Sequence, residues 1–306
     1  TLGFPIGSTA KMFTIVTALE HAWPVNGSVP APAAGPNANQ AHIFEPNVYH
    51  DACSSPDPWP VRNDETTAGP SMAFRDATAH SVNTAFAASM IALGGCEVQK
   101  TMTKMGLLDG AGDPTQPAPS SLVLGSGSVP PLTLANSYAT LAADGKFCDI
   151  NPIDRIETAN GKKIKLPATK CKQVISPDVA RGATELLKGV IQYGTGTAAG
   201  IGRPAAGKTG THEAHQQSWF VGYTPQLATA VYVGTPITSY EMKGWHAVIG
   251  GISYGEVFGG TIAAPLWGTI MRQLEADMPV EGFTSPSSAI LYGNLSPLPG
   301  VLGMSL

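Results

Sequence analysis

The clearest hydrophobic pattern of the chain lies over residues 8–22, which are apolar on nearly every side. The large apolar side chains recur at helical spacing, at Met12, Ile15, Val16 and Leu19. Trp23-Pro24 ends the run, because proline does not continue a helix. A helix that is apolar all round is a buried helix. The pattern therefore predicts a buried helix over residues 8–22.

A long irregular connection and a helical pair follow. Residues 26–70 are rich in Pro, Asn, Ser and Gly and show no sustained period, which predicts a surface connection with short elements at most. Residues 71–80 and 84–93 then show helical spacing, with the tripeptide Ser81-Val82-Asn83 at the break between them. We expect a helix, a loop and a helix here.

The second half of the chain begins with a well-marked helix. Ser176 is a typical N-cap residue, Pro177 suits a first helical turn, and Gly194 predicts the helix end. Residues 219–223 and 227–233 alternate bulky and small side chains around a turn, which predicts a β-hairpin.

The end of the chain completes the prediction of the fold class. A short strand near residues 247–249 precedes a closing helix over 261–276. Residues 284–306 are rich in Ser, Pro, Gly and Leu without a period, which predicts a covering loop or linker after a main domain of residues 1–283. Helices early and strands late indicate an α+β fold.

Composition narrows the class of protein. The chain has 306 residues, 43% of them hydrophobic and 13% charged, which excludes a disordered chain. Its net charge of -4 offers no positive field for nucleic acid. With 35 Gly and 26 Pro it is not a helix bundle or coiled coil. The most apolar stretch, residues 85–95, is far shorter than a membrane span. Any targeting signal is expected outside residues 1–306.

The four cysteines are Cys53, Cys96, Cys148 and Cys171, and they allow three pairings. None forms a C-x-x-C pair, so the sequence does not support a zinc site, and two structural disulfides of an exported protein are expected. Residues around 145–146 and 160–161 predict a small hairpin whose far arm returns near Cys171. We therefore predict a Cys148–Cys171 bond and, by exclusion, a Cys53–Cys96 bond.

Three short motifs match known patterns in the wrong context. Residues 202–209 match the P-loop pattern, but a helix end precedes them and a strand follows. Gly251 to Gly255 match the nucleophile elbow around Ser253, but all histidines precede that serine, so the triad order is impossible. His212-Glu213-Ala214-His215 is one residue short of the metalloprotease motif, and we interpret it as a solvated surface.

A set of three motifs carries a consistent chemistry. Ser8 to Lys11 give S-x-x-K, Ser81 to Asn83 give S-x-N, and Lys208-Thr209-Gly210 give K-T-G, each once and in this order. Ser8 begins the buried helix, and Lys11 follows on the same helix face. A desolvated lysine can take the proton of a serine hydroxyl and so create a nucleophile.

The other two motifs supply the remaining parts of such a site. Ser81 and Asn83 at i and i+2 of a loop suit a proton relay and an amide donor. Lys208 and Thr209 on a strand add a fixed cation and a hydroxyl. Gly210 leaves room for a substrate backbone to lie along that strand.

This set is found in serine β-lactamases and penicillin-binding proteins. The chain resembles the transpeptidase domain of the bifunctional (class A) penicillin-binding proteins and is most similar to actinobacterial members. The supporting segments outside the motifs are SVNTAF at 81–86, LGSGS at 124–128, AGKTGT at 206–211, WFVGYTP at 219–225 and AAPLW at 263–267. The resemblance implies a five-stranded antiparallel sheet between helical layers and an acyl-serine mechanism on peptidoglycan stem peptides ending in D-Ala-D-Ala. It implies no cofactor and no metal.

The resemblance also implies individual roles. Ser8 would attack the D-Ala carbonyl, Lys11 would be the base, Ser81 would return a proton to the leaving amine, and Asn83 would orient the donor peptide. The terminal carboxylate of the donor would be held by Lys208, Thr209 and Thr211, and backbone N–H groups of Ser8 and Thr211 would form the oxyanion hole. Covalent inhibition by β-lactams follows.

Two departures from the family pattern shape the expectations. Ile6 separates Pro5 from the Gly-Ser pair, and the strands that normally precede the nucleophile helix are missing before Ser8. We therefore expect an N-terminally incomplete domain of a longer extracytoplasmic protein of the cell envelope, with its membrane anchor outside this chain.

Three alternatives share the motifs: a D,D-carboxypeptidase, a β-lactamase and a penicillin-binding sensor domain without turnover. A class A β-lactamase would carry a Glu with an Asn four residues later between Asn83 and Lys208, and no such pair exists in the sequence. We therefore expect a persistent acyl-enzyme. Because the helix that carries Lys11 is apolar all round, burial penalises the ammonium form, and we also expect a neutral Lys11 at working pH.

Overall fold

The computed structural model describes residues 3–48, 51–53, 57–115, 118–211, 215–235, 240–244 and 247–293. Its centre is an antiparallel sheet in the order β11-β12-β13. The strands are β11 (Ala206–Thr211), β12 (Gln217–Tyr223) and β13 (Ala228–Gly234). The last two form the predicted hairpin. The resemblance implied five strands, and the described residues place three in this sheet. The family's five strands include those that precede the helix of Ser8, which the sequence analysis expected to be missing from this chain. Among the described residues before Ser8, β1 (Phe4–Pro5) forms a strand and pairs with β6 (Ser128–Val129).

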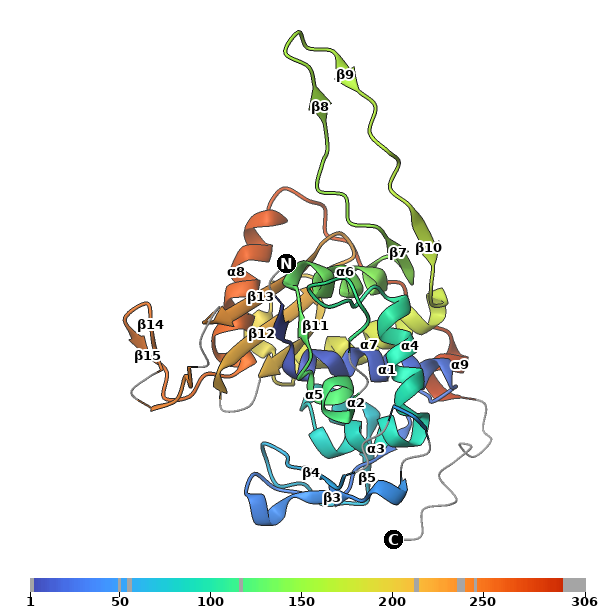
Figure 1. The fold of residues 1–306 in the computed structure, drawn as a ribbon, viewed down its shortest axis with the longest axis vertical. Coiled ribbons are helices and arrows are strands. Elements are labelled where there is room, and N and C mark those ends of the chain that lie inside the picture. The colour runs from blue at the N-terminus through green and yellow to red at the C-terminus, as the bar shows by residue number, and fades with distance from the viewer. Residues whose placement is uncertain are drawn as a thin grey trace.

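Alternation along β12 separates two hydrophobic layers. Phe220 packs against Trp267 of α8 (Ala264–Leu274), on the side of the sheet where α8 lies in Figure 1. Trp219, Val221 and Tyr223 belong to the main core on the other side, with α6 (Pro131–Ala142) and α7 (Pro177–Gln192). Because successive side chains of a strand point to opposite faces, one strand supports both layers. The predicted α+β class is confirmed.

The predicted buried helix begins as a 3-10 turn and continues as an α-helix. The turn is Gly7–Ala10, and α1 is Lys11–Glu20. Every residue from Lys11 to Leu19 is buried, because α3 (Asn83–Leu93), α4 (Gly95–Lys104) and α7 surround the helix. The all-round apolar pattern is therefore explained by its position in the middle of the helical layer (Figure 1).

The helical pair differs from the prediction at one end. Residues 71–73 form strand β5 (Ser71–Ala73), which pairs with β2 (Ser28–Pro30), and only then does α2 (Phe74–Ala79) begin. The pairing with a distant strand outweighs the local helical pattern. The connection over 26–70 otherwise holds short elements, as predicted. They are β2, β3 (His42–Phe44), β4 (Trp59–Val61) and 3-10 turns at Ala38–Gln40 and Pro46–Val48.

The second half of the helical layer follows the local signals of the sequence. Ser176 caps α7, since its side chain accepts a hydrogen bond from the Val179 N–H. The closing helix starts with a π-helical turn, Gly259–Ala263, before α8. Part of the predicted tail is folded: α9 (Ser288–Tyr292) packs against α7, and Ser287 donates to Asp178. Among the described residues, no helix is both long and apolar enough to cross a membrane.

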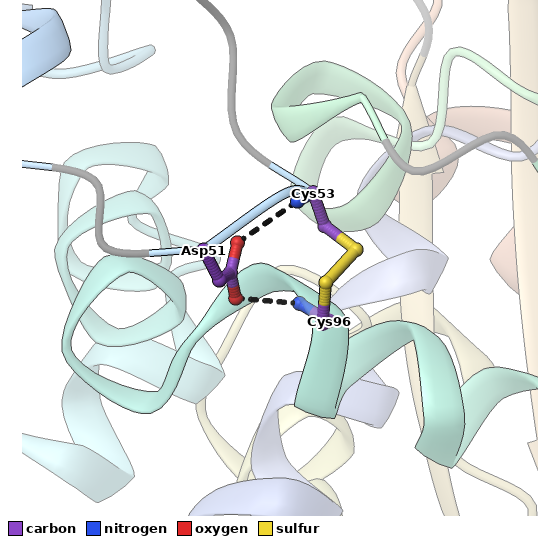
Figure 2. Close-up of side chains that lie close together, drawn as sticks. All are labelled: Asp51, Cys53 and Cys96. Carbon is purple, nitrogen blue, oxygen red and sulfur yellow. Dashed lines mark hydrogen bonds between the residues drawn. A yellow bond between two sulfur atoms is a disulfide. The ribbon is translucent and has the colours of Figure 1, made fainter.

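Both predicted disulfides are present. Cys53 bonds Cys96 at the start of α4, and the Asp51 carboxylate accepts hydrogen bonds from the backbone N–H groups of both cysteines (Figure 2). These three side chains lie close together in the manner of a metal site, but both sulfur atoms are used by the disulfide. The cluster is therefore a structural clamp between the connection and α4.

The second disulfide, Cys148–Cys171, joins the base of a projecting arm that comprises residues 146–173. The base is the pair β7 (Lys146–Cys148) and β10 (Cys171–Gln173), and further out lie β8 (Ile156–Glu157) and β9 (Lys163–Ile164). Figure 1 shows the arm extending away from the body. A smaller hairpin, β14 (Val248–Ile249) with β15 (Ile252–Ser253), projects beside the sheet, and α5 (Pro119–Leu124) lies in the helical layer.

Candidate active site

Lys11 is the centre of the candidate site. Its Nζ lies 3.0 Å from Ser8 Oγ and 3.1 Å from Ser81 Oγ, and it donates to the Ser81 backbone oxygen at 2.7 Å. It also donates to Asn83 Oδ1. The first two motifs of the sequence, on α1 and before α3, therefore meet at one nitrogen atom.

The loop between α2 and α3 has the backbone shape that this contact requires. Ser81 has a φ of 57°, and the Val82 N–H donates to the Ala77 oxygen, which closes the end of α2. Asn83 then begins α3, and its Nδ2 donates to the Arg62 oxygen at 2.8 Å. The left-handed residue turns the chain so that Ser81 Oγ and Asn83 Oδ1 both face Lys11.

Burial controls the proton on Lys11. The side chain is fully buried, and desolvation lowers its pKa to about 7, while the charge of Asp64 acts in the opposite direction. A neutral amine keeps two N–H donors and one lone pair. The Ser81 oxygen and Asn83 Oδ1 accept from the donors, so the lone pair remains for the Ser8 hydroxyl proton. The lowered pKa is in the direction that the expected neutral Lys11 requires.

Lys208, which the sequence analysis expected to be a fixed cation, lies in a buried environment. It is fully buried on β11, and its Nζ donates to the Thr209 backbone oxygen at 3.2 Å. Burial first, and the charge of Lys11 second, lower the pKa of Lys208 well below its ordinary value. The charged form is therefore disfavoured while no anion lies beside it. No hydrogen bond joins Lys208 to Ser8 or Ser81 in the described part of the chain.

Two hydroxyl groups of β11 are held by partners elsewhere. Thr209 Oγ1 lies 2.6 Å from Thr195 Oγ1, and Thr211 Oγ1 accepts from the Gly259 N–H at 3.1 Å. The backbone of Gly210 is packed so closely that an added Cβ would lie 2.6 Å from the Ile6 oxygen. The K-T-G segment is thus fixed between the backbone before Ser8 on one side and the π-helical turn Gly259–Ala263 on the other.

Gly7 brings the backbone before Ser8 against Thr211. Its φ is +57°, and an added Cβ would lie 2.6 Å from the Thr211 oxygen and 2.9 Å from the Thr211 nitrogen. Gly125 supports this turn, since its oxygen accepts from the N–H groups of Ile6 and Gly7. The backbones that carry Ser8 and Thr211 are therefore adjacent, and a side chain at position 7 would separate them.

Sequence reasoning missed three residues that support the site. Asn63 is buried and binds Thr84 at the start of α3, Thr195 binds Thr209, and the Tyr138 hydroxyl donates to the Thr9 oxygen at 2.8 Å. None lies in a motif. Their partners are distant in sequence, so no local pattern indicates them.

Two of the three rejected motifs, the P-loop match and the nucleophile-elbow match, lie in the contexts that the sequence suggested. Lys208 lies within a strand, not between a strand and a helix, so the P-loop interpretation fails. Ser253 is exposed on the small β14–β15 hairpin. Residues 212–214 of the histidine motif lie outside the described residues, and His215 Nδ1 lies 3.3 Å from the Val257 oxygen.

Comparison with models of protein families shows the family to which the chain belongs. The model of the penicillin binding protein transpeptidase domain matches residues 2–245. The chain belongs to this family. All three motif sets of the candidate site lie within the matched region, and the resemblance noted in the sequence is confirmed.

Curated relatives carry the name penicillin-binding protein 1A. That of Aquifex aeolicus is 32% identical over 251 residues, which cover 81% of this chain and 32% of the relative. That of Neisseria meningitidis serogroup A is 34% identical over 164 residues, which cover 51% of this chain and 19% of the relative. The chain thus spans about a third or less of these proteins.

Solved structures share the fold. PonA1 from Mycobacterium tuberculosis in complex with penicillin V has a TM-score of 0.72 at 24% identity, over 97% of this chain and 76% of that one. Penicillin-binding protein A from M. tuberculosis, as an imipenem acyl-enzyme complex, has a TM-score of 0.66 at 20% identity, over 89% of this chain and 60% of that one. The transpeptidase fold is therefore present over nearly the whole chain.

Proposed function

We propose that this chain is a D,D-transpeptidase domain that cross-links peptidoglycan stem peptides through an acyl-serine intermediate and is acylated by β-lactams. The observation that carries the proposal is the contact of Lys11 Nζ with Ser8 Oγ, Ser81 and Asn83 in a buried site. Penicillin V and imipenem complexes of structures with the same fold support it.

Acylation would proceed in two stages, attack by Ser8 and departure of the leaving amine. Ser8 Oγ attacks the carbonyl carbon of the penultimate D-Ala and its proton passes to Lys11 Nζ, while backbone N–H groups of Ser8 and Thr211 bind the developing oxyanion. The C–N bond to the terminal D-Ala then breaks. The leaving amine takes a proton from Ser81, which regains one from Lys11.

The third motif would hold the donor. The terminal carboxylate of the stem peptide brings a negative charge next to Lys208, and this favours the protonated lysine that burial alone disfavours. Hydroxyl groups of Thr209 and Thr211 add hydrogen bonds, and Gly210 lets the peptide backbone lie close to β11. Asn83 orients the peptide on the other side.

The acyl-enzyme would persist with penicillin and react onward with its natural substrate. The sequence offers no Glu with a following Asn to activate water, as a class A β-lactamase would. A bound penicillin keeps its leaving group tethered and shields the ester. With a stem peptide the departing D-Ala frees that space, and an acceptor amine enters. The carboxypeptidase and sensor alternatives differ in lacking this transfer.

We also propose an extracytoplasmic location, with the membrane anchor in a part of the protein outside this chain. Two disulfides fit an oxidising compartment. The relatives named penicillin-binding protein 1A are more than twice as long as this chain, which leaves room for such an anchor.

Mass spectrometry of the intact protein after incubation with a penicillin tests the proposal. We expect one penicilloyl adduct that maps to Ser8, is absent in Ser8→Ala and survives for an hour after the free drug is removed. Label on Ser253, or an adduct in Ser8→Ala, would contradict the assignment of the nucleophile. Steady hydrolysis of a chromogenic cephalosporin would favour the β-lactamase alternative, and acylation without transfer to any amine would favour the sensor.

A further inference from the structure

The loop that begins at Arg62 is fastened to the edge of the candidate site. The Arg62 oxygen accepts from Asn83 Nδ2 at 2.8 Å, and Asn83 in turn contacts Lys11. Asn63 is buried, accepts from the Thr84 N–H at 2.9 Å and donates to the Thr84 hydroxyl at 3.0 Å. The residue that follows, Asp64, is therefore held at a defined place beside the site.

The Asp64 carboxylate at this place is exposed and has no ion-pair partner among the described residues. No hydrogen bond joins its side chain to another residue in the described ranges either. Its charge raises the pKa of both Lys11 and Lys208, against the effect of burial. The carboxylate thus acts on both lysines of the site from the solvent side.

The negative charge of Asp64 does not help to bind the donor peptide. Its terminal group is a carboxylate, which Asp64 repels and the Lys208 side attracts. The second substrate of a transpeptidase is an amine, which is an ammonium ion in water. A carboxylate at the mouth of the site favours that ion and opposes an acceptor with a carboxylate next to its amine.

We propose that Asp64 is a specificity-determining residue that binds the ammonium group of the acceptor and selects acceptors without a carboxylate beside the amine. The inference rests on the proposed transpeptidase function. The acceptor first gives one proton to Lys11, and its nitrogen then attacks the acyl carbon. A C–N bond forms, the ester C–O bond to Ser8 breaks, and Ser8 Oγ takes up the second proton that the nitrogen gives up.

The partition of the acyl-enzyme between amine and water tests the proposal. The acyl-enzyme is formed from a D-Ala thioester donor, whose thiol release reports acylation. It is then offered glycinamide or glycine, which differ in the carboxylate next to the amine. The ratio of aminolysis to hydrolysis does not depend on how fast the acyl-enzyme formed, so an altered acylation rate does not disturb the comparison.

In Asp64→Asn we expect the ratio for glycinamide to fall about fivefold, at the upper end of the effect of an exposed ion pair. The ratio for glycine should not fall, because loss of the attraction to its ammonium is offset by loss of the repulsion of its carboxylate. Asp64→Glu should keep the preference for glycinamide. Glu65→Gln, which removes the adjacent exposed carboxylate, is the matched control and should behave as the wild type.

An unchanged preference for glycinamide in Asp64→Asn, or an equal loss in Glu65→Gln, would overturn the role of Asp64 while leaving the transpeptidase proposal intact. Absence of any thiol release in the wild type is the distinct outcome that removes the proposed function itself and this inference with it.

Discussion

Lysine has opposite surroundings in two regions of this molecule, the candidate active site and the projecting arm. Lys11 and Lys208 are fully buried, and both have lowered pKa values because their charged forms lose hydration. Lys162, Lys163 and Lys165 are exposed along the arm, away from the body (Figure 1). The residue type is the same, so the chemistry of the site comes from burial and from the partners that burial brings together.

The two regions also differ in how their backbones are held. Around the site, distant segments are joined by buried side-chain bonds, such as Asn63 with Thr84 and Thr195 with Thr209. The arm is held by short strand pairs and one disulfide at its base. A two-stranded ribbon is marginally stable by itself. We therefore expect changes in the site to alter the chemistry and changes in the arm to leave it unaffected.

The largest expected effect is on acylation in Lys11→Ala. Removal of the base should slow formation of the penicilloyl adduct by about 10³-fold, within the usual range for a general base. Stopped-flow or quenched mass spectrometry measures the rate. Lys163→Ala in the arm is the matched control and should react at the wild-type rate. If Lys11→Ala retained most of the rate, the base would be another group.

The disulfides provide the next comparison. Loss of the Cys53–Cys96 bond, in a double Cys→Ala variant, should lower the free energy of unfolding by about 2–4 kcal/mol. The bond fastens the long connection to α4, which packs on α1. Denaturant unfolding measures the change. In the corresponding variant of Cys148 and Cys171, the acylation rate should stay at the wild-type value, and a large loss would show that the arm supports the site.

The pH dependence of acylation should follow Lys11. Its pKa of about 7 means that the neutral, basic form dominates above this value and is lost as the pH falls below it. We expect a plateau at alkaline pH and a rate that falls about tenfold for each further pH unit on the acid side. Lys163→Ala should show the same profile. A rate that stays flat from pH 9 to 6 would place the base elsewhere.

The smallest expected effect is that of Thr195→Val. The substitution removes the Thr195 partner of the Thr209 hydroxyl without a large change in volume and leaves that hydroxyl only its 3.5 Å contact with Lys208 Nζ. A buried hydroxyl that loses its hydrogen bond costs about 1–3 kcal/mol. We expect acylation to slow by about tenfold at every pH. The pH at which the acylation rate begins to fall should stay the same, because the surroundings of Lys11 are unchanged. Thr195→Ser should restore most of the rate. A shifted pH profile would mean that Thr195 acts on Lys11 and not on Thr209.

The sequence by itself determined the elements that depend on local contacts. The all-round apolar pattern identified the buried α1, the Ser176 cap identified the start of α7, and alternation identified the hairpin of β12 and β13. The three motifs identified the candidate residues, because their order and residue types belong to one chemistry. Periodicity and capping arise within a few residues of the chain, so they can be read from it directly.

The tertiary structure decided the burial and the hydrogen bonds that arise between segments distant in the sequence. It made β5 a strand through its pairing with β2, and it gave Lys11 its contacts across the fold with Ser81 and Asn83. It also buried Lys208, which the sequence analysis expected to be a fixed cation, and this burial lowers the pKa of the lysine. Desolvation and long-range hydrogen bonds depend on which side chains surround a group in space, and that arrangement exists only once the chain has folded.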